Sequence, residues 1–217
     1  MFAFALLLLS VQFDPYAAAV PISSFLPFGP SVGDNEVRRG IHIVEGPIPL
    51  RVEFPFFDKK ENIVFVGTNG VITFQQGFFQ FAPTTCGPLD AEWRMVAPFW
   101  ADFDTNSTGG NIYYRESNDQ RLLQVISNEV AAAFPQLWGL NLQWLFIVTW
   151  FEGPYHGAPV PSCPGFPLNN TIQAILTTDG TYSFAVFYYH RVSWTTGAWG
   201  SSDPCGLGGI AARVRMV

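Results

Sequence analysis

VAPFWADFDTNSTGGNIYYRES, residues 96–117, is the stretch that decides which fold the chain is expected to adopt. Aromatic and β-branched residues fill both of its ends, and such residues are typical of β-strands. Between the ends lie two aspartates, an asparagine and the turn residues TGG (108–110). The stretch therefore predicts two strands, over 94–101 and 111–116, joined by a loose hairpin turn.

Short apolar runs between turn signals continue on both sides of this stretch. Asn69-Gly70 and Asp179-Gly180 each predict a two-residue type I′ hairpin, because that turn needs positive φ at both central residues. In ARVRM (212–216) apolar and basic residues alternate, which predicts a strand with one buried face. The remaining expected strands are 41–45, 50–54, 62–67, 71–74, 144–151, 171–177 and 181–194.

One segment has the periodicity of a helix. SNDQ (117–120) fits a capping box, with Ser117 at the cap and Gln120 at the third helical position. Pro135 ends the run that follows. The apolar stripe expected to pack on a sheet consists of Leu122, Ile126, Val130 and Phe134.

These elements predict a mainly β fold, an antiparallel β-sandwich of jelly-roll-like type with one flanking α-helix. Aromatic residues make up 16% of the 217 residues and charged residues 13%, the latter about half the usual share. A net charge of −6 and the absence of clustered basic residues argue against nucleic acid as a partner. The β-domain is expected over 41–217, after an extended lead-in over 20–40 that is rich in Pro and Gly.

The chain opens with MFAFALLLLSVQFDPYAAAV (1–20). The apolar run 2–11 is too short to span a bilayer, and AAA (17–19) offers the small residues of a cleavage site. A secretory signal peptide is therefore predicted over 1–19; a buried N-terminal helix is the alternative that Pro15 disfavours. No later apolar stretch reaches the length of a transmembrane helix.

Secretion agrees with two N-glycosylation sequons, at Asn106 and Asn169. It also permits a disulfide among the three cysteines. A hairpin at 179–180 would pair Thr178 with Thr181 and bring both of its chains to one open end, close to Cys163 and Cys205. We therefore predict the bridge Cys163–Cys205, with Cys86 left unpaired in a separate loop.

The aspartates of WADFDTNSTGG (100–110) allow three interpretations. An EF-hand-type calcium loop fails, because Ser107 stands where Gly is needed and Tyr113 where the bidentate Glu belongs. Asp102 and Asp104 would share one side of a strand about 6.5 Å apart, which is loosely compatible with a glycosidase pair. The favoured interpretation is structural, with both aspartates bonding backbone amides as the chain turns.

Other catalytic arrangements are weakly represented. Glu152 is the third acid that a hydrolase could use, and no histidine stands beside a serine or cysteine in a recognisable pattern. His42, His156 and His190 are far apart in the sequence and are each expected to serve as ordinary sheet or loop residues. The sequence thus predicts no enzyme, no cofactor and no metal site.

Three segments, taken in order, resemble the NIDO domain, the extracellular module of nidogen and alpha-tectorin, with the N-terminal domain of alpha-tectorin-like proteins as the nearest match. LPFGPSVGD (26–34) is similar to the lead-in of that domain, so the resemblance covers about residue 26 to the end. The segments are FPFFDKKENIVFVGTNGVITF (54–74), VAPFWADFDTNSTGGNIYYRES (96–117), and FIVTWFEGPYHG (146–157) with NNTIQAILTTDGTYSFAVFYYHRVSWTTG (169–197).

The resemblance implies a secreted, non-enzymatic module of the extracellular space or matrix that serves cell–matrix adhesion through matrix or cell-surface proteins. The alternative is a secreted glycan-binding module. Aromatic rings near loops, such as Trp138, Tyr155 and Trp199, could stack on sugars, although such rings also fill cores.

Overall fold

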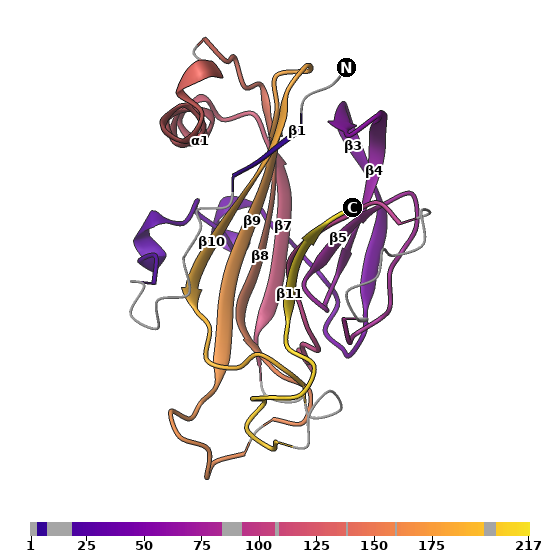
Figure 1. Cartoon of the computed structure of the whole chain (residues 1–217), viewed down its shortest axis with the longest axis vertical. Coiled ribbons are helices and arrows are strands. Elements are labelled where there is room, and N and C mark those ends of the chain that lie inside the picture. The colour runs from indigo at the N-terminus through magenta and orange to yellow at the C-terminus, as the bar shows by residue number, and fades with distance from the viewer. Residues whose placement is uncertain are drawn as a thin grey trace.

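Two β-sheets packed face to face form the molecule, as Figure 1 shows. The computed structural model describes residues 4–7, 19–83, 93–106, 109–137, 139–158, 160–197 and 203–217. The first sheet has the order β1 (Phe4–Leu7), β10 (Ser183–Arg191), β9 (Asn169–Thr178), β8 (Trp144–Pro154), β7 (Asn111–Ser117), β2 (Asn35–Glu36). The second has the order β11 (Arg213–Met216), β6 (Met95–Trp100), β5 (Val71–Phe74), β4 (Lys59–Gly67), β3 (Val44–Phe56).

Successive strands pair with their neighbours in two runs, β3 to β6 in the second sheet and β7 to β10 in the first. These pairs are antiparallel, whereas β1 joins β10 in the parallel sense. β11 returns to the second sheet and pairs with β6. The predicted antiparallel sandwich with one flanking α-helix is confirmed for the part of the chain that the structure describes.

The quoted stretch does not form a hairpin, and that prediction is wrong. β6 and β7 belong to different sheets, so the residues between them cross from one sheet to the other. Backbone bonds hold this crossing to distant segments: Ala101 N donates to Asn69 O at 3.1 Å, and Asp104 N donates to Pro154 O at 3.0 Å. If β6 and β7 paired with each other through a hairpin turn, these hydrogen bonds to distant segments would not form.

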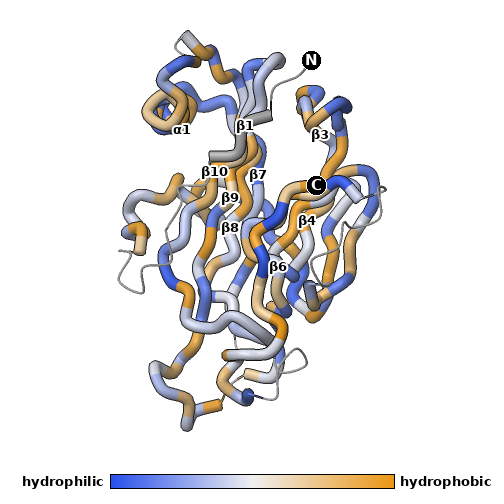
Figure 2. Tube along the Cα trace, in the orientation of Figure 1, coloured by the Kyte–Doolittle hydropathy of each residue, from blue (hydrophilic) through white to orange (hydrophobic). Residues whose placement is uncertain are grey.

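Side chains from the inner faces of both sheets fill the space between them. Phe54 packs on Phe74 from the second sheet and on Trp144 from the first, with ring centroids 5.8 and 5.7 Å apart. In β8 the odd-numbered Leu145 and Ile147 turn instead to the outer face. Strand β8 is therefore buried on both faces, which explains its continuous apolar sequence, and Figure 2 shows the hydrophobic stretches along the strands.

Helix α1 (Gln120–Ala133) covers the outer face of the first sheet, as predicted for the apolar stripe. Its cap differs from the prediction: Asp119 is the N-cap and accepts from Arg121 N, so Ser117 lies outside the helix. Leu123 is accordingly the buried residue of the first turn, and the predicted Leu122 is partly buried against the same cluster. The other buried helix residues are Ile126 and Val130, and Phe134 is the C-cap before the 3₁₀ turn η3 (Pro135–Leu137).

Both predicted two-residue turns are longer than expected. Gly67 pairs with Val71, which leaves a three-residue loop around Asn69-Gly70. Thr178 pairs with Ser183 and not with Thr181, which leaves four residues in the second loop. The Asp179 carboxylate accepts hydrogen bonds from the backbone N–H groups of Thr181 and Tyr182, and these bonds widen the loop.

Two further strand predictions need correction. The expected strands 41–45 and 50–54 contribute to one long strand, β3, whose pairing with β4 shifts register twice. The pairing of the C-terminal segment is confirmed, but its register shifts between Arg213 and Arg215. This irregularity turns Val214 outward, where 45% of it is exposed, so the predicted alternation of buried residues fails there.

The lead-in lies against the first sheet and contains the 3₁₀ turns η1 (Ile22–Ser24) and η2 (Pro30–Val32). Leu26 and Gln173 exchange two hydrogen bonds of 2.9 and 3.0 Å between the Leu26 backbone and the Gln173 amide. Val20 N donates to Tyr189 O at 3.0 Å, next to the strand β1 that comes from the predicted signal peptide. Within the described residues no helix is both long and apolar enough to cross a membrane.

Candidate functional site

Two histidines meet the buried side chain of Asp102 where β6 and β8 end. We call the set of Asp102, His42 and His156 the Asp102 junction. His42 Nε2 lies 3.1 Å from Asp102 Oδ1, and His156 Nδ1 lies 3.3 Å from Asp102 Oδ2, both within hydrogen-bond distance. Both carboxylate oxygens thus have an imidazole partner in a site where the Asp102 side chain is only 3% exposed.

The pKa of Asp102 is raised above its ordinary value. Burial is the largest cause, because a carboxylate away from water disfavours its charge. The imidazoles of His156 and His42 act in the opposite direction without cancelling the effect. The junction therefore depends on both histidines to make a buried carboxylate tolerable.

The surroundings of the junction fix its geometry. His156 N donates to Asp102 O at 2.8 Å, and the His42 ring stacks on Phe81 with centroids 4.7 Å apart. A Cβ on Gly197 would come within 2.5 Å of the Asp102 Cβ, so only glycine allows this close approach. Five segments distant in sequence are thereby held together at one end of the sandwich.

The second aspartate has a separate role. Asp104 Oδ1 accepts from Asn106 N at 2.8 Å, which is the bond to a turning backbone that the structural interpretation predicts. Among the described residues the Asp102 side chain bonds imidazoles and no backbone amide, so the predicted amide bonds are not found there. Glu152 is exposed at the bulge of β8, and it does not join the junction.

The junction resembles part of a catalytic triad only in its histidine–aspartate contacts. An aspartate that orients an imidazole prepares it to act as a base, and nucleophilic catalysis then requires a hydroxyl or thiol beside that base. In the described ranges no such group is hydrogen-bonded to His42, and no three acidic, histidine or cysteine side chains are grouped as metal ligands. The contacts that are present join loops.

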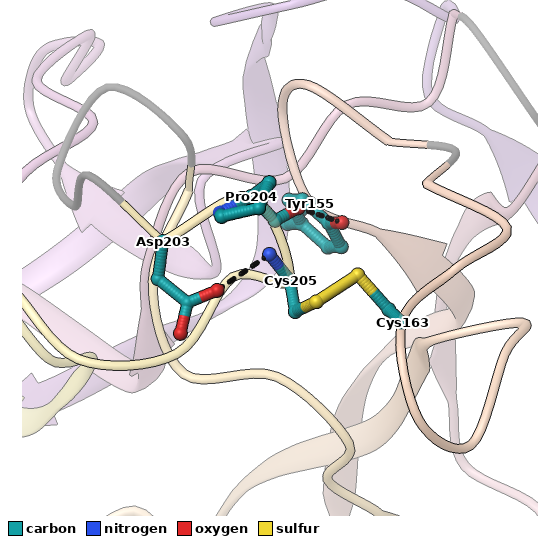
Figure 3. The surroundings of a disulfide bond; sticks show 5 residues. All are labelled: Tyr155, Cys163, Asp203, Pro204 and Cys205. Carbon is teal, nitrogen blue, oxygen red and sulfur yellow. Dashed lines mark hydrogen bonds between the residues drawn. A yellow bond between two sulfur atoms is a disulfide. The ribbon is translucent and has the colours of Figure 1, made fainter.

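A disulfide joins two loops of the described chain, and Figure 3 shows its surroundings. It joins Cys163 to Cys205, with Cα atoms 5.5 Å apart, and this is the pair that the hairpin predicts. The Tyr155 hydroxyl donates to Pro204 O at 2.6 Å, while Cys205 N donates to Asp203 Oδ1 at 2.7 Å. The bridge therefore ties the loop after β8 to the loop after β10, and Cys86 lies outside the described residues.

The aromatic residues proposed for sugar stacking receive little support. Tyr155 is 1% exposed, so its ring belongs to the core and not to a binding surface. Trp138 and Trp199 lie outside the described residues. Of the sequon residues, Asn106 is exposed and Asn169 is partly exposed at the start of β9; glycosylation of either stays a prediction.

Sequence reasoning missed the Asp102 junction. His42 and His156 lie 60 and 54 residues from Asp102, and neither spacing belongs to a known local motif. Each histidine directly follows a residue that forms a β-bridge to the crossing. His42 follows Ile41, which bridges to Asp104, and His156 follows Tyr155, which bridges to Phe103. Only the pairing of those segments reveals that the histidines converge.

Comparison with known proteins gives a consistent answer. The family model of the nidogen-like domain (NIDO) matches residues 62–214. The chain is 38% identical to alpha-tectorin of Gallus gallus over 96% of its own length and 9% of that protein. It is 32% identical to nidogen-1 of Mus musculus over 87% of its own length and 15% of that protein. No solved structure matches.

The chain thus spans less than a sixth of the length of either relative. The match covers Asp102 and His156 of the junction, the crossing and most strands of both sheets, while His42 precedes it. Secretion into the extracellular space or matrix, as predicted from the sequence, agrees with the relatives. The chain belongs to the nidogen-like domain family and is a module of the extracellular matrix.

Proposed function

We propose that the chain serves cell–matrix adhesion by binding matrix or cell-surface proteins, and that it catalyses no reaction. The observation that carries this proposal is the nidogen-like match over residues 62–214, together with the similarity to alpha-tectorin and nidogen-1. The fold supports it as well, because a disulfide-bridged sandwich offers rigid surfaces for contact. The Asp102 junction contributes by fixing loops at one end of that sandwich.

The test measures retention in a deposited matrix. Cells that lay down a matrix would secrete the chain fused to a labelling peroxidase, and the cells would then be removed. We expect the fusion to remain in the insoluble fraction, to be displaced by excess untagged chain, and to label matrix or cell-surface proteins. Retention no greater than that of the secreted peroxidase alone would contradict the proposal.

Two additional measurements separate adhesion from the other functions. Specific binding to a glycan array, in place of protein labelling, would identify a lectin. Turnover of a glycoside that Asp102→Asn removes would identify a hydrolase. If neither glycan binding nor glycoside turnover is detected, while retention of the chain in the matrix is saturable, the result supports adhesion through protein contacts.

A further inference from the structure

An apolar cavity of about 280 Å³ lies between the end of β8 and the start of β9. Aliphatic and aromatic side chains line it, and the exception is Asn169, the first residue of the sequon Asn169-Asn170-Thr171. Its volume is just below the usual range of ligand sites, roughly 300–1,000 Å³, and suits one ring-sized group. A glycan acceptor thus lies on the wall of a small apolar hollow.

We propose that Asn169 carries an N-linked glycan whose first N-acetylglucosamine packs against Phe166 and covers this cavity. The donor is a lipid-linked pyrophosphate oligosaccharide. The bond between C1 of the sugar and the pyrophosphate oxygen breaks, C1 bonds to Asn169 Nδ2, and Nδ2 releases one proton as the lipid pyrophosphate leaves. The transfer precedes folding, which is why the sequon works although Thr171 is 3% exposed in the folded chain.

Phe166 is suited to receive the sugar. It lines the cavity and is 46% exposed, so much of its ring is open to a neighbouring group. An aromatic face gives the C–H groups of a pyranose an apolar surface, while the sugar hydroxyls keep their contact with water. A sugar bonded three residues farther along the chain is close enough to use that surface.

The loop that carries Phe166 is held in place before any sugar arrives. The disulfide fixes its start at Cys163, and Phe166 N donates to Cys163 O at 3.2 Å. Arg191 of β10 donates to Gly165 O at 3.3 Å and to Pro167 O at 2.8 Å, on either side of the phenylalanine. Such pre-organisation reduces the ordering entropy that packing would otherwise cost.

Asn169 is available for the linkage. Its backbone is fixed, because it pairs with Pro154 and its carbonyl accepts from Ser193 Oγ at 2.8 Å. Its side-chain amide forms no hydrogen bond with the described residues, and the residue is partly exposed. A glycan on Nδ2 therefore breaks no contact of the fold.

The second sequon supplies an internal comparison. Asn106 also has a phenylalanine three residues before it, Phe103, but that ring is 0% exposed in the core. A sugar on the exposed Asn106 would have no aromatic surface at that position. The two sites should therefore differ in how much their glycans stabilise the fold, and this difference does not depend on the adhesive function proposed above.

The experiment compares variants secreted by animal cells. Peptide mass analysis gives the occupancy of Asn169, and thermal unfolding gives the midpoint for the unmodified chain, Asn169→Gln, Phe166→Ala and the double variant. We expect Asn169→Gln and Phe166→Ala each to lower the midpoint by about 2–4 °C. In the double variant Phe166→Ala should add nothing further, and trimming to a single N-acetylglucosamine should preserve the midpoint.

Asn106→Gln is the matched control and should leave the effect of Phe166→Ala unchanged. Three results would overturn the inference. They are an unmodified Asn169 in secreted protein, equal midpoints with and without the Asn169 glycan, and an effect of Phe166→Ala that is the same with and without Asn169→Gln. None of these results bears on retention in the matrix, so the adhesive function can fail or hold separately.

Discussion

At the scale of single residues, the two aspartates of the crossing show what a local pattern reveals. Asp104 bonds the amide of Asn106 two positions away, and turn chemistry predicts such a bond directly. The partners of Asp102 are His42 and His156, which lie far from it in the sequence. No spacing rule links them, because their contact arises from the pairing of separate segments.

The buried carboxylate of Asp102 leads to a prediction about pH. Its raised pKa means that it binds a proton more tightly in the folded chain than in the unfolded chain. Its contribution to stability is therefore complete below the ordinary aspartate pKa of about 3.9 and is lost as the pH rises through the folded pKa. Asp102→Asn lacks this loss, so it should gain stability relative to the unmodified protein as the pH rises toward neutral.

Urea denaturation of both proteins at several pH values between about 4 and 7 measures that difference. Asp58→Asn is the control, because the Asp58 side chain is 81% exposed and its replacement should give a nearly constant difference. If the unmodified protein instead gained stability over Asp102→Asn with rising pH, the imidazoles would outweigh burial and the interpretation of the junction would be wrong.

At the scale of elements, strands and the helix were predictable, whereas their ends were not. Continuous apolar runs predicted β8 because it is buried on both faces, and helical spacing predicted α1. The turn before β10 was mispredicted because the Asp179 carboxylate bonds two backbone amides and enlarges the loop. Side-chain hydrogen bonds of this kind decide the register of strands and the caps of helices. They compete with backbone hydrogen bonds of comparable energy, so the sequence alone does not show which will form.

The two hairpin glycines provide a matched prediction. Gly70 and Gly180 both have positive φ, at 73° and 91°. A Cβ on Gly180 would meet nothing within 4 Å, whereas one on Gly70 would lie 1.9 Å from Phe99 O. Gly180→Ala should cost about 1–2 kcal/mol of backbone strain, and Gly70→Ala about 3 kcal/mol or more, because overpacking adds to the strain.

Chemical denaturation of the two glycine variants gives these free energies. Equal losses would show that the Phe99 carbonyl moves aside at little cost, and the close approach of β6 to this turn would then carry no energetic weight.

The disulfide predicts a further loss of stability at this scale. Cys163 and Cys205 are separated by 42 residues, and opening a loop of that length frees the unfolded chain by about 4 kcal/mol in the chain-entropy account. The double variant Cys163→Ala with Cys205→Ala should be less stable by that amount in urea. Reductant should shift the midpoint of the unmodified protein and leave that of the double variant in place.

Peptide mapping without reductant provides the independent check. A bridge from Cys86 to either Cys163 or Cys205 in the secreted protein would contradict the pairing.

At the scale of the whole molecule, the sandwich was predictable and the crossing between its sheets was not. Many short strands with aromatic side chains predict two packed sheets. The sequence pattern of aromatic and β-branched residues in β6 and β7 is the same whether the two strands pair with each other or lie in different sheets. What separates them is the burial of Phe103 in the core and its bridge to Tyr155, both of which involve residues distant in sequence.

Processing of the precursor gives a prediction for the intact protein. Signal removal after residue 19 should make Val20 the first residue, because AAA (17–19) fits the rule for cleavage sites. The backbone of Val20 already contacts β10, where its N–H donates to Tyr189 O and its carbonyl contacts His190 Nδ1 at 2.9 Å. N-terminal sequencing of secreted material should therefore begin at Val20, and an intact Met1 would contradict the prediction.

The return of β11 to β6 has a consequence for the order of events during translation. Ala97 leaves the ribosome long before its partner Arg215 does, so one edge of β6 waits without a strand while β7 to β10 of the first sheet are made. Cys205 also emerges late, shortly before β11. Closing the second sheet and oxidising the cysteines thus both wait until this last part of the domain has been made, and until then an open edge of β6 is exposed to chaperones and to neighbouring nascent chains.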